Sequence, residues 1–125
     1  MPKLSNAPEW RSDSNAFLLT IPDILSIGGS LPANGTTEEV YRVRAEVINV
    51  YNTTYGNMII QDEDGNRLTV YGVSDSNGTR YDGIANAPGV GDVVILEAPI
   101  KHYYNAGTGE RIIELFQSYL VAIVE

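Results

Sequence analysis

Residues 40–51 carry the feature that most constrains the fold of this chain, an alternation of apolar and polar side chains. Tyr41, Val43, Ala45 and Val47 are separated by single charged residues. A period of two gathers apolar side chains on one face of an extended strand, whereas a helix would spread them around its axis. The sequence therefore predicts a β-strand over 40–51 with one face in a core.

Four further segments are predicted to be strands. Residues 57–61 and 67–71 flank an Asp64-Gly65 pair, which indicates a hairpin whose type I′ turn requires positive φ at both central residues. Residues 93–98 form a short apolar run after a turn. Residues 111–124 also contain apolar residues at helical spacing, but their β-branched and aromatic residues favour a long, bent strand. A chain of 125 residues has the size of one domain.

Short helices and flexible ends complete the expected layout. A helix is predicted to begin at Thr20 and to end at Gly28-Gly29, because a threonine cap precedes a proline in the first turn. A second helix is expected over 80–87, with Tyr81 and Ile84 pointing inward, and residues 99–109 are expected to form a loop. Residues 1–16 are expected to form a flexible arm, and 17–125 to form the folded domain.

Five strands with a helix between the third and fourth match the OB fold, a five-stranded Greek-key barrel. The motifs are Tyr41-x-Val-Arg-x-x-Val47, Tyr55-Gly56-Asn57-x-x-Ile60-x-Asp62, Asp64-Gly65-Asn66, Val70-Tyr71-Gly72 and Gly91-Asp92-Val93. Over roughly residues 17–125 they resemble bacterial OB-fold domains attached to exported or surface proteins and nucleases. Ala45 stands where such domains often have glycine. The resemblance implies an all-β five-stranded Greek-key OB-fold barrel with one or two short α-helices.

The resemblance also implies a ligand groove across the second and third strands, bordered by two loops. The candidate ligand-binding residues are Tyr55, Asn57, Arg67, Thr69, Tyr71, Lys101, His102, Tyr103 and Tyr104. Of the third strand, Leu68 and Val70 are expected to face inward, so that its polar residues face the ligand. Aromatic side chains stack on bases and cations follow the phosphate backbone. These residues predict binding of single-stranded nucleic acid, an oligonucleotide, on the barrel face.

Two other partner classes stay open. The formal net charge is −8, and a negative chain repels phosphate at long range. Tyrosines and amides also suit sugars, which predicts an oligosaccharide-binding module. The third alternative is a structural or protein-interaction module of a larger bacterial protein, in which the acidic surface provides solubility.

Catalysis, metals and cofactors are not expected. The chain has no cysteine and one histidine, His102, which excludes thiolate metal sites, cysteine nucleophiles and sites with several histidines. Asp62, Asp64 and Asn66 alternate as calcium ligands do, but Gly65 stands at the fourth position and not the sixth, so a hairpin turn is favoured. No phosphate-binding loop or serine nucleophile elbow occurs. We expect a non-catalytic binding module.

The sequence predicts no membrane insertion, because its apolar stretches are far shorter than a bilayer requires. Residues 1–15 are polar and lack the apolar segment of a secretion signal. This pattern fits a cytoplasmic protein or the mature form of an exported one.

Overall fold

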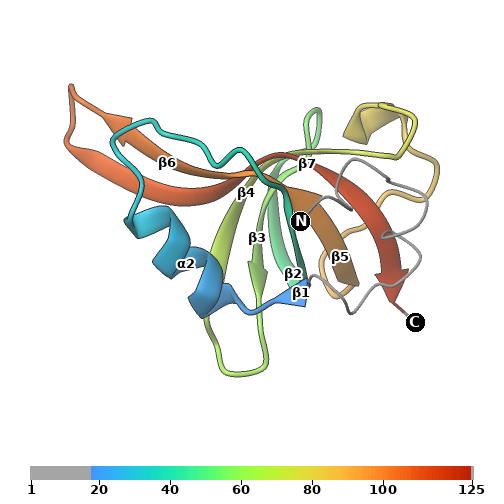
Figure 1. Cartoon of the computed structure of the whole chain (residues 1–125). Coiled ribbons are helices and arrows are strands. Elements are labelled where there is room, and N and C mark those ends of the chain that lie inside the picture. The colour runs from blue at the N-terminus through green and yellow to red at the C-terminus, as the bar shows by residue number, and fades with distance from the viewer. Residues whose placement is uncertain (1–17, 125) are drawn as a thin grey trace.

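The computed structural model describes residues 18–124, which form a mostly β structure with seven strands and one short α-helix (Figure 1). The strands are β1 (Leu18–Leu19), β2 (Tyr41–Asn52), β3 (Asn57–Gln61), β4 (Arg67–Ser74), β5 (Val93–Ala98), β6 (Ile100–Asn105) and β7 (Glu110–Val124). Five of them close a ring in the order β2, β3, β4, β7, β5 and back to β2. The five expected strands are thus present, but β1 and β6 were not predicted. The expected arm, residues 1–16, lies outside the described residues.

The core lies inside this ring and follows the predicted alternation. Val47 of β2 pairs with Ile60 of β3, and Ile60 pairs with Leu68 of β4. All three side chains are buried, as are Val43 and Val70 on the same faces of their strands. The inward orientation expected for Leu68 and Val70 is confirmed.

The predicted first helix is confirmed as α2 (Ile21–Gly29). Thr20 caps it, because the Thr20 side chain accepts a hydrogen bond from the Asp23 amide and the Asp23 carboxylate accepts one from the Thr20 amide. Ile24 is fully buried in the core, and Gly28 is held close to β7, since a Cβ there would lie 2.2 Å from Cγ2 of Ile113. The helix α2 is therefore packed tightly against the ring.

The prediction of a loop over residues 99–109 was wrong, because residues 100–105 form β6 and pair with β7 in a long hairpin (Figure 1). Pro99 ends β5, and the chain then continues beside the same partner strand. The other edge of β6 is covered by the segment 34–37. The Asn34 amide donates to the His102 carbonyl over 2.7 Å, and the Thr37 amide donates to the Ile100 carbonyl over 2.9 Å.

The predicted helix over residues 80–87 was also wrong, since only a single 3₁₀ turn, η2 (Tyr81–Gly83), forms there. The rest of the segment is held by Tyr81 and not by helical hydrogen bonds. The Tyr81 ring packs on Gly56, where a Cβ would come within 2.6 Å of it, and its hydroxyl donates to the Pro88 carbonyl. Tyr81 thereby packs against the core as expected.

Two turns of similar construction flank β4. In residues 62–66 and 75–79 the first residue is an aspartate whose carboxylate accepts hydrogen bonds from the amides two and four residues later. Each turn has glycine with positive φ at its fourth position, +87° at Gly65 and +83° at Gly78. The predicted hairpin at Asp64-Gly65 is confirmed, but the turn is not type I′, because Asp64 has no positive φ.

The last segment is the strand β7, as expected, and not a helix. It pairs with β6 through its first half and with β5 through its second. Gln117, between these halves, has a φ of +53°, and the buried positions change from Leu115 to Ser118 across it. The predicted bend therefore lies at Gln117. Among residues 18–124, no helix combines the length and apolarity required to cross a membrane.

Candidate ligand-binding groove

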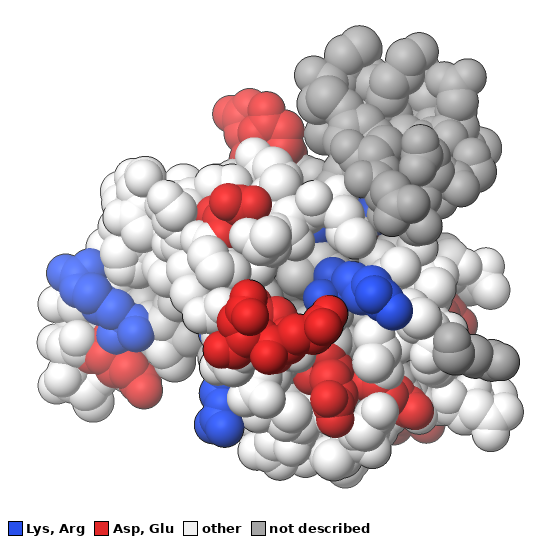
Figure 2. All heavy atoms as spheres, turned by 90° about the horizontal axis from the view of Figure 1, so that it is seen from below, with Lys and Arg blue, Asp and Glu red and all other residues white. Residues whose placement is uncertain are grey.

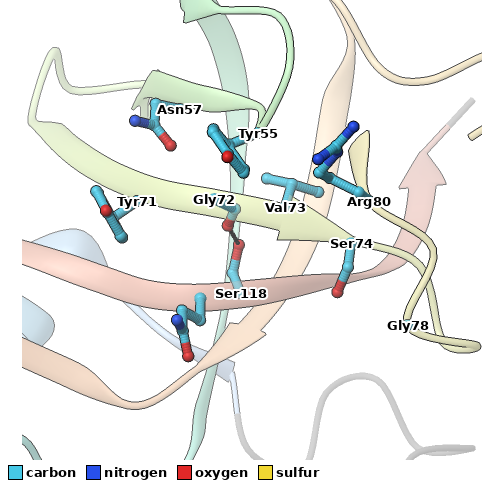
Figure 3. Close-up of a pocket in the computed structure, with 10 residues that line it drawn as sticks. Tyr55, Asn57, Tyr71, Gly72, Val73, Ser74, Gly78, Arg80 and Ser118 are labelled. Atoms are coloured by element: carbon cyan, nitrogen blue, oxygen red, sulfur yellow. Dashed lines mark hydrogen bonds between the residues drawn. The ribbon is translucent and has the colours of Figure 1, made fainter. Parts of the chain in front are cut away.

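A surface groove of about 430 Å³ lies where β4 and β7 run side by side, next to the loop between β2 and β3. We call it the binding groove. Its lining residues are Tyr55, Asn57, Tyr71, Gly72, Val73, Ser74, Gly78, Arg80, Gln117 and Ser118. Figure 3 shows Tyr71 toward one end and Arg80 toward the other, with Tyr55 and Gly72 between them. Three of the nine predicted ligand residues, Tyr55, Asn57 and Tyr71, are brought together here.

The floor of the binding groove contains two neighbouring residues with left-handed backbone. Gly72 of β4 has a φ of +86° and Gln117 of β7 a φ of +53°. They lie opposite each other, since a Cβ on Gly72 would be 3.9 Å from the Gln117 Cα. The Ser118 hydroxyl donates to the Gly72 carbonyl over 2.7 Å, and the Val73 amide donates to the Tyr55 carbonyl over 2.8 Å. These bonds fix both strands and the loop around the floor.

At one end of the binding groove, the lining residue Tyr71 belongs to a stack of side chains from three strands. The Tyr71 ring stacks on Phe116, with centroids 5.6 Å apart and planes within 5°. On β6, the Lys101 ammonium lies 4.4 Å from the centroid of the Phe116 ring. Tyr71 is 47% exposed, so it keeps a free aromatic surface while its orientation is set by Phe116. The predicted residue Lys101 does not line the groove and is linked to Tyr71 only through Phe116, a residue that sequence reasoning missed.

The other end presents Tyr55 together with Arg80. The Arg80 guanidinium lies 5.4 Å from the Tyr55 ring centroid, and Tyr55 is 53% exposed. Two nitrogens of Arg80 donate to the Asp82 carboxylate over 2.8 and 2.9 Å. These hydrogen bonds lower the pKa of Asp82. Of the groove residues given above, Arg80 alone carries a charge, and the Asp82 carboxylate paired with it offsets that charge.

Two side-chain amides complete the lining. The Oδ1 atom of Asn57 is buried and has no hydrogen-bond partner within residues 18–124. Gln117, in contrast, is exposed. Amides carry both a donor and an acceptor, so both can bond to the polar edge of a planar ligand.

The remaining predicted residues are spread over both faces of the sheet. Arg67 is bonded to Gln61 at the far end of β4, about 13 Å from Tyr71 by strand geometry. Thr69 lies between Arg67 and Tyr71 on the same face. Tyr103 alternates with His102 along β6 and shares the face of Lys101. Arg67, Thr69 and Tyr103 therefore lie on the same side of the sheet as the binding groove but do not line it.

His102 and Tyr104 lie on the opposite face of β6, which corrects their assignment to a mobile ligand loop. His102 is buried, its Nδ1 atom is 2.9 Å from the Leu31 carbonyl, and its Nε2 atom is 3.2 Å from Arg111. Because Arg111 is always a donor, Nε2 accepts and Nδ1 carries the proton. Arg111 also lies over the Tyr104 ring, 4.5 Å from its centroid. These residues hold the β6–β7 hairpin to the segment after α2.

A buried carboxyl group lies on the groove side of the sheet. Glu114 pairs with Thr69 on one side and Lys101 on the other, and it is only 6% exposed. Burial raises the pKa of Glu114, and the Lys101 charge partly offsets this rise. Partial burial and the Glu114 charge also raise the pKa of Tyr51.

Several acidic residues gather at the other end of β3 and β4. A second groove, which we call the acidic groove, is lined there by four carboxylates and one arginine: Glu46, Asp62, Glu63, Asp64 and Arg44. Figure 2 views the molecule from this end and shows acidic side chains gathered near the middle of the face. The negative net charge is therefore not evenly distributed, and the binding groove lies away from this acidic surface.

Sequence reasoning missed Phe116, Arg80 and Gln117. Arg80 directly follows the turn 75–79, whose resemblance to the turn 62–66 indicates that the chain reverses and returns to β4. Phe116 follows Glu114 at a spacing of two, so strand alternation places it on the same face. No sequence signal predicts the left-handed backbone of Gln117.

Comparison with models of protein families and with curated protein sequences gave no match. Within the described part of the chain, no group of three or more histidine, cysteine, aspartate or glutamate side chains is placed to hold a metal ion. Any functional assignment for this protein therefore depends on the chemistry of the binding groove itself.

Proposed function

We propose that this protein is an OB-fold module without catalytic activity that binds single-stranded nucleic acid in the binding groove. The observation that carries the proposal is the pair of exposed tyrosines, Tyr71 and Tyr55, each backed by a cation or a second ring. Bases of any sequence stack on such rings, each contributing about 1–3 kcal/mol. Support for the OB fold comes from the strand order, in which the third strand of the ring pairs in parallel with the last.

Two cations are available for the phosphates of such a strand. Arg80 lies at one end of the binding groove, and Lys101 lies at the other end behind Phe116. Each phosphate neutralised on a single strand contributes about −0.7 to the slope of log affinity against log salt. Two contacts predict a slope of about −1.4, which is modest and agrees with the small number of cations.

The test is a fluorescence-anisotropy titration with labelled single-stranded oligonucleotides of about ten nucleotides at low salt. We expect Tyr71→Ala to weaken binding about tenfold, because it removes a stacking surface. The matched control is Tyr104→Ala, which removes a tyrosine from the opposite face and should leave the affinity unchanged. Absence of binding by the unmodified protein at low salt would show that the proposal is wrong.

The same protein samples test the two other partner classes. Salt-insensitive quenching of tyrosine fluorescence by oligosaccharides, without oligonucleotide binding, would replace nucleic acid by a glycan. Tyrosines and the amides of Asn57 and Gln117 are compatible with that ligand as well. If neither ligand binds and light scattering shows stable self-association, a structural module is the better assignment.

A further inference from the structure

The left-handed backbone at Gln117 is sterically unfavourable for a residue with a Cβ atom. The bend in β7 does not require a glutamine at this position. Side chains with a Cβ rarely adopt a φ of +53°, and such positions favour glycine or asparagine. The neighbouring residue Gly72 has the same backbone handedness and is a glycine. At Gln117 a glycine would allow the same bend without steric conflict.

Packing does not explain the glutamine either. Its side chain is exposed and makes no hydrogen bond to any other residue of 18–124, while Phe116 and Ser118 on each side are bonded to Pro99 and Gly72. The backbone is thus held from both sides, and the Gln117 amide is left at the surface of the binding groove. Unfavourable backbone conformations persist mainly where the surrounding structure enforces them, and they cluster at ligand sites.

We propose that Gln117 reads the edge of a nucleobase that stacks on Tyr71, and that the preferred base is adenine. This inference rests on the function proposed above. The carboxamide oxygen of glutamine accepts from the adenine N6 amino group while its NH₂ donates to the adjacent ring nitrogen, a bidentate pairing. Adenine offers this donor–acceptor pair on both of its accessible edges. Its two-ring system also covers more of the exposed Tyr71 surface than a pyrimidine does.

Asn57 contributes a second amide to the same site. Its buried Oδ1 atom lacks a donor in the described structure, and an unsatisfied buried acceptor costs free energy.

The test compares oligo(dA) with oligo(dT) of equal length, for the unmodified protein and for Gln117→Gly. The unmodified protein should bind oligo(dA) several-fold more tightly, because thymine offers a donor–acceptor pair on its Watson–Crick edge alone and a smaller ring for stacking. Gln117→Gly should remove this preference. Because glycine accepts positive φ, the variant should also unfold at a temperature about 4 °C higher. We therefore expect Gln117→Gly to unfold at a higher temperature and to lose the preference for oligo(dA) over oligo(dT).

The matched control is Asn86→Gly. Asn86 also has a left-handed backbone, with a φ of +56°, and it is exposed and outside the binding groove. This substitution should not lower the unfolding temperature, and it should leave the preference for oligo(dA) intact. The control therefore separates relief of backbone strain from loss of the amide.

Three results would overturn the inference while leaving the proposed function standing. One is equal affinity of the unmodified protein for the two oligonucleotides. Another is an equal loss of affinity for both in Gln117→Gly, which would place the amide on the sugar–phosphate backbone. The third is a lower unfolding temperature for that variant, which would make the glutamine structural. Failure of the unmodified protein to bind either oligonucleotide would instead refute the proposed function.

Discussion

Single side chains on the groove side of the sheet are held in place before any ligand arrives. Phe116 fixes the orientation of Tyr71, and Lys101 in turn lies over Phe116. Arg80 lies near Tyr55 and is itself held by Asp82. A side chain that is already ordered loses less conformational entropy on binding, so more of its stacking energy becomes affinity.

The buried carboxyl group of Glu114 makes stability depend on pH in the direction opposite to an ordinary ion pair. Its pKa is raised in the folded protein, so the folded state resists its ionisation. Stability is therefore greatest below the unfolded pKa and decreases as pH rises through the raised pKa. Glu114→Gln should unfold a few degrees higher than the unmodified protein at pH 7 and show no advantage near pH 4.

The measurement for Glu114 is thermal unfolding followed by circular dichroism between pH 4 and pH 8. Glu110→Gln on the same strand is the control, because Glu110 is exposed and should show little change at any pH. A difference for Glu114→Gln that does not vary with pH would contradict the role of ionisation.

Prediction from the sequence succeeded for residues whose environment follows from strand alternation. Tyr71 was expected to face outward and Val70 inward, and their exposures agree. It did not succeed where the partner is distant along the chain. Arg42 alternates with apolar residues, yet it is buried in an ion pair with Glu97, whose Oε1 lies 3.2 Å from its Nε. Nothing near Arg42 in the sequence indicates that partner.

At the scale of elements, the two aspartate turns set both ends of β4. The turn 75–79 brings Arg80 back to pair with Ser74 and thereby to the binding groove. Hydrogen bonds lower the pKa values of both aspartates: the largest contribution comes from the Asn66 side-chain amide for Asp62 and from the Thr79 backbone amide for Asp75. A lowered pKa means stability that is present above the unfolded pKa and lost as pH falls through the folded value.

Substitution of Asp75 tests the second turn. Asp75→Ala removes both hydrogen bonds, so it should lower the unfolding temperature by a few degrees and weaken oligonucleotide binding by displacing Arg80. Asp75→Asn keeps an acceptor oxygen and should preserve most of both properties. Thermal unfolding at pH 7 and the anisotropy titration measure the two effects. Equal behaviour of the two variants would argue against a role for the turn hydrogen bonds.

The elements that sequence reasoning missed share a physical cause. The segment 100–105 contains an isoleucine and two tyrosines, which favour strands, but Pro99 and two nearby glycines favoured a loop. Its pairing with β7 across the hairpin outweighed these local signals. The helix expected over 80–87 contains Gly83, and the contacts of Tyr81 with Gly56 and Pro88 replaced helical hydrogen bonds. In both segments tertiary contacts decided the structure.

At the scale of the whole molecule, charge is separated along β3 and β4. The acidic groove and the binding groove lie at opposite ends of β3 and β4, which are about 17 Å and 26 Å long by strand geometry. The screening length of salt solution is roughly 30 Å at 0.01 M and 8 Å at 0.15 M. The acidic end therefore repels an approaching oligonucleotide at low salt and has almost no influence at physiological salt.

Reversing one charge in the acidic groove tests this separation. Glu63→Lys should raise oligonucleotide affinity several-fold at 0.01 M salt and leave it unchanged at 0.15 M. Arg80→Gln, in the binding groove, should lower affinity at both concentrations because its contact is direct. A persistent effect of Glu63→Lys at 0.15 M would place the ligand on the acidic groove instead.

The five strands of the ring could be predicted from the sequence, but β1, β6 and the pairings that join the strands into a ring could not be derived from local periodicity. Closure depends on β7 pairing with β4 in parallel and with β5 in antiparallel, and both contacts join segments far apart along the chain. Local periodicity contains no information on such pairings. The groove between β4 and β7 was unpredictable for the same reason.

The last-made strand of the ring has a consequence for biosynthesis. Because β7 joins β4 to β5, both of those strands have open edges until the ribosome has released residues 110–124. The ring therefore closes only after residues 110–124 have been made, and until then the nascent chain exposes strand edges that can mispair with other chains.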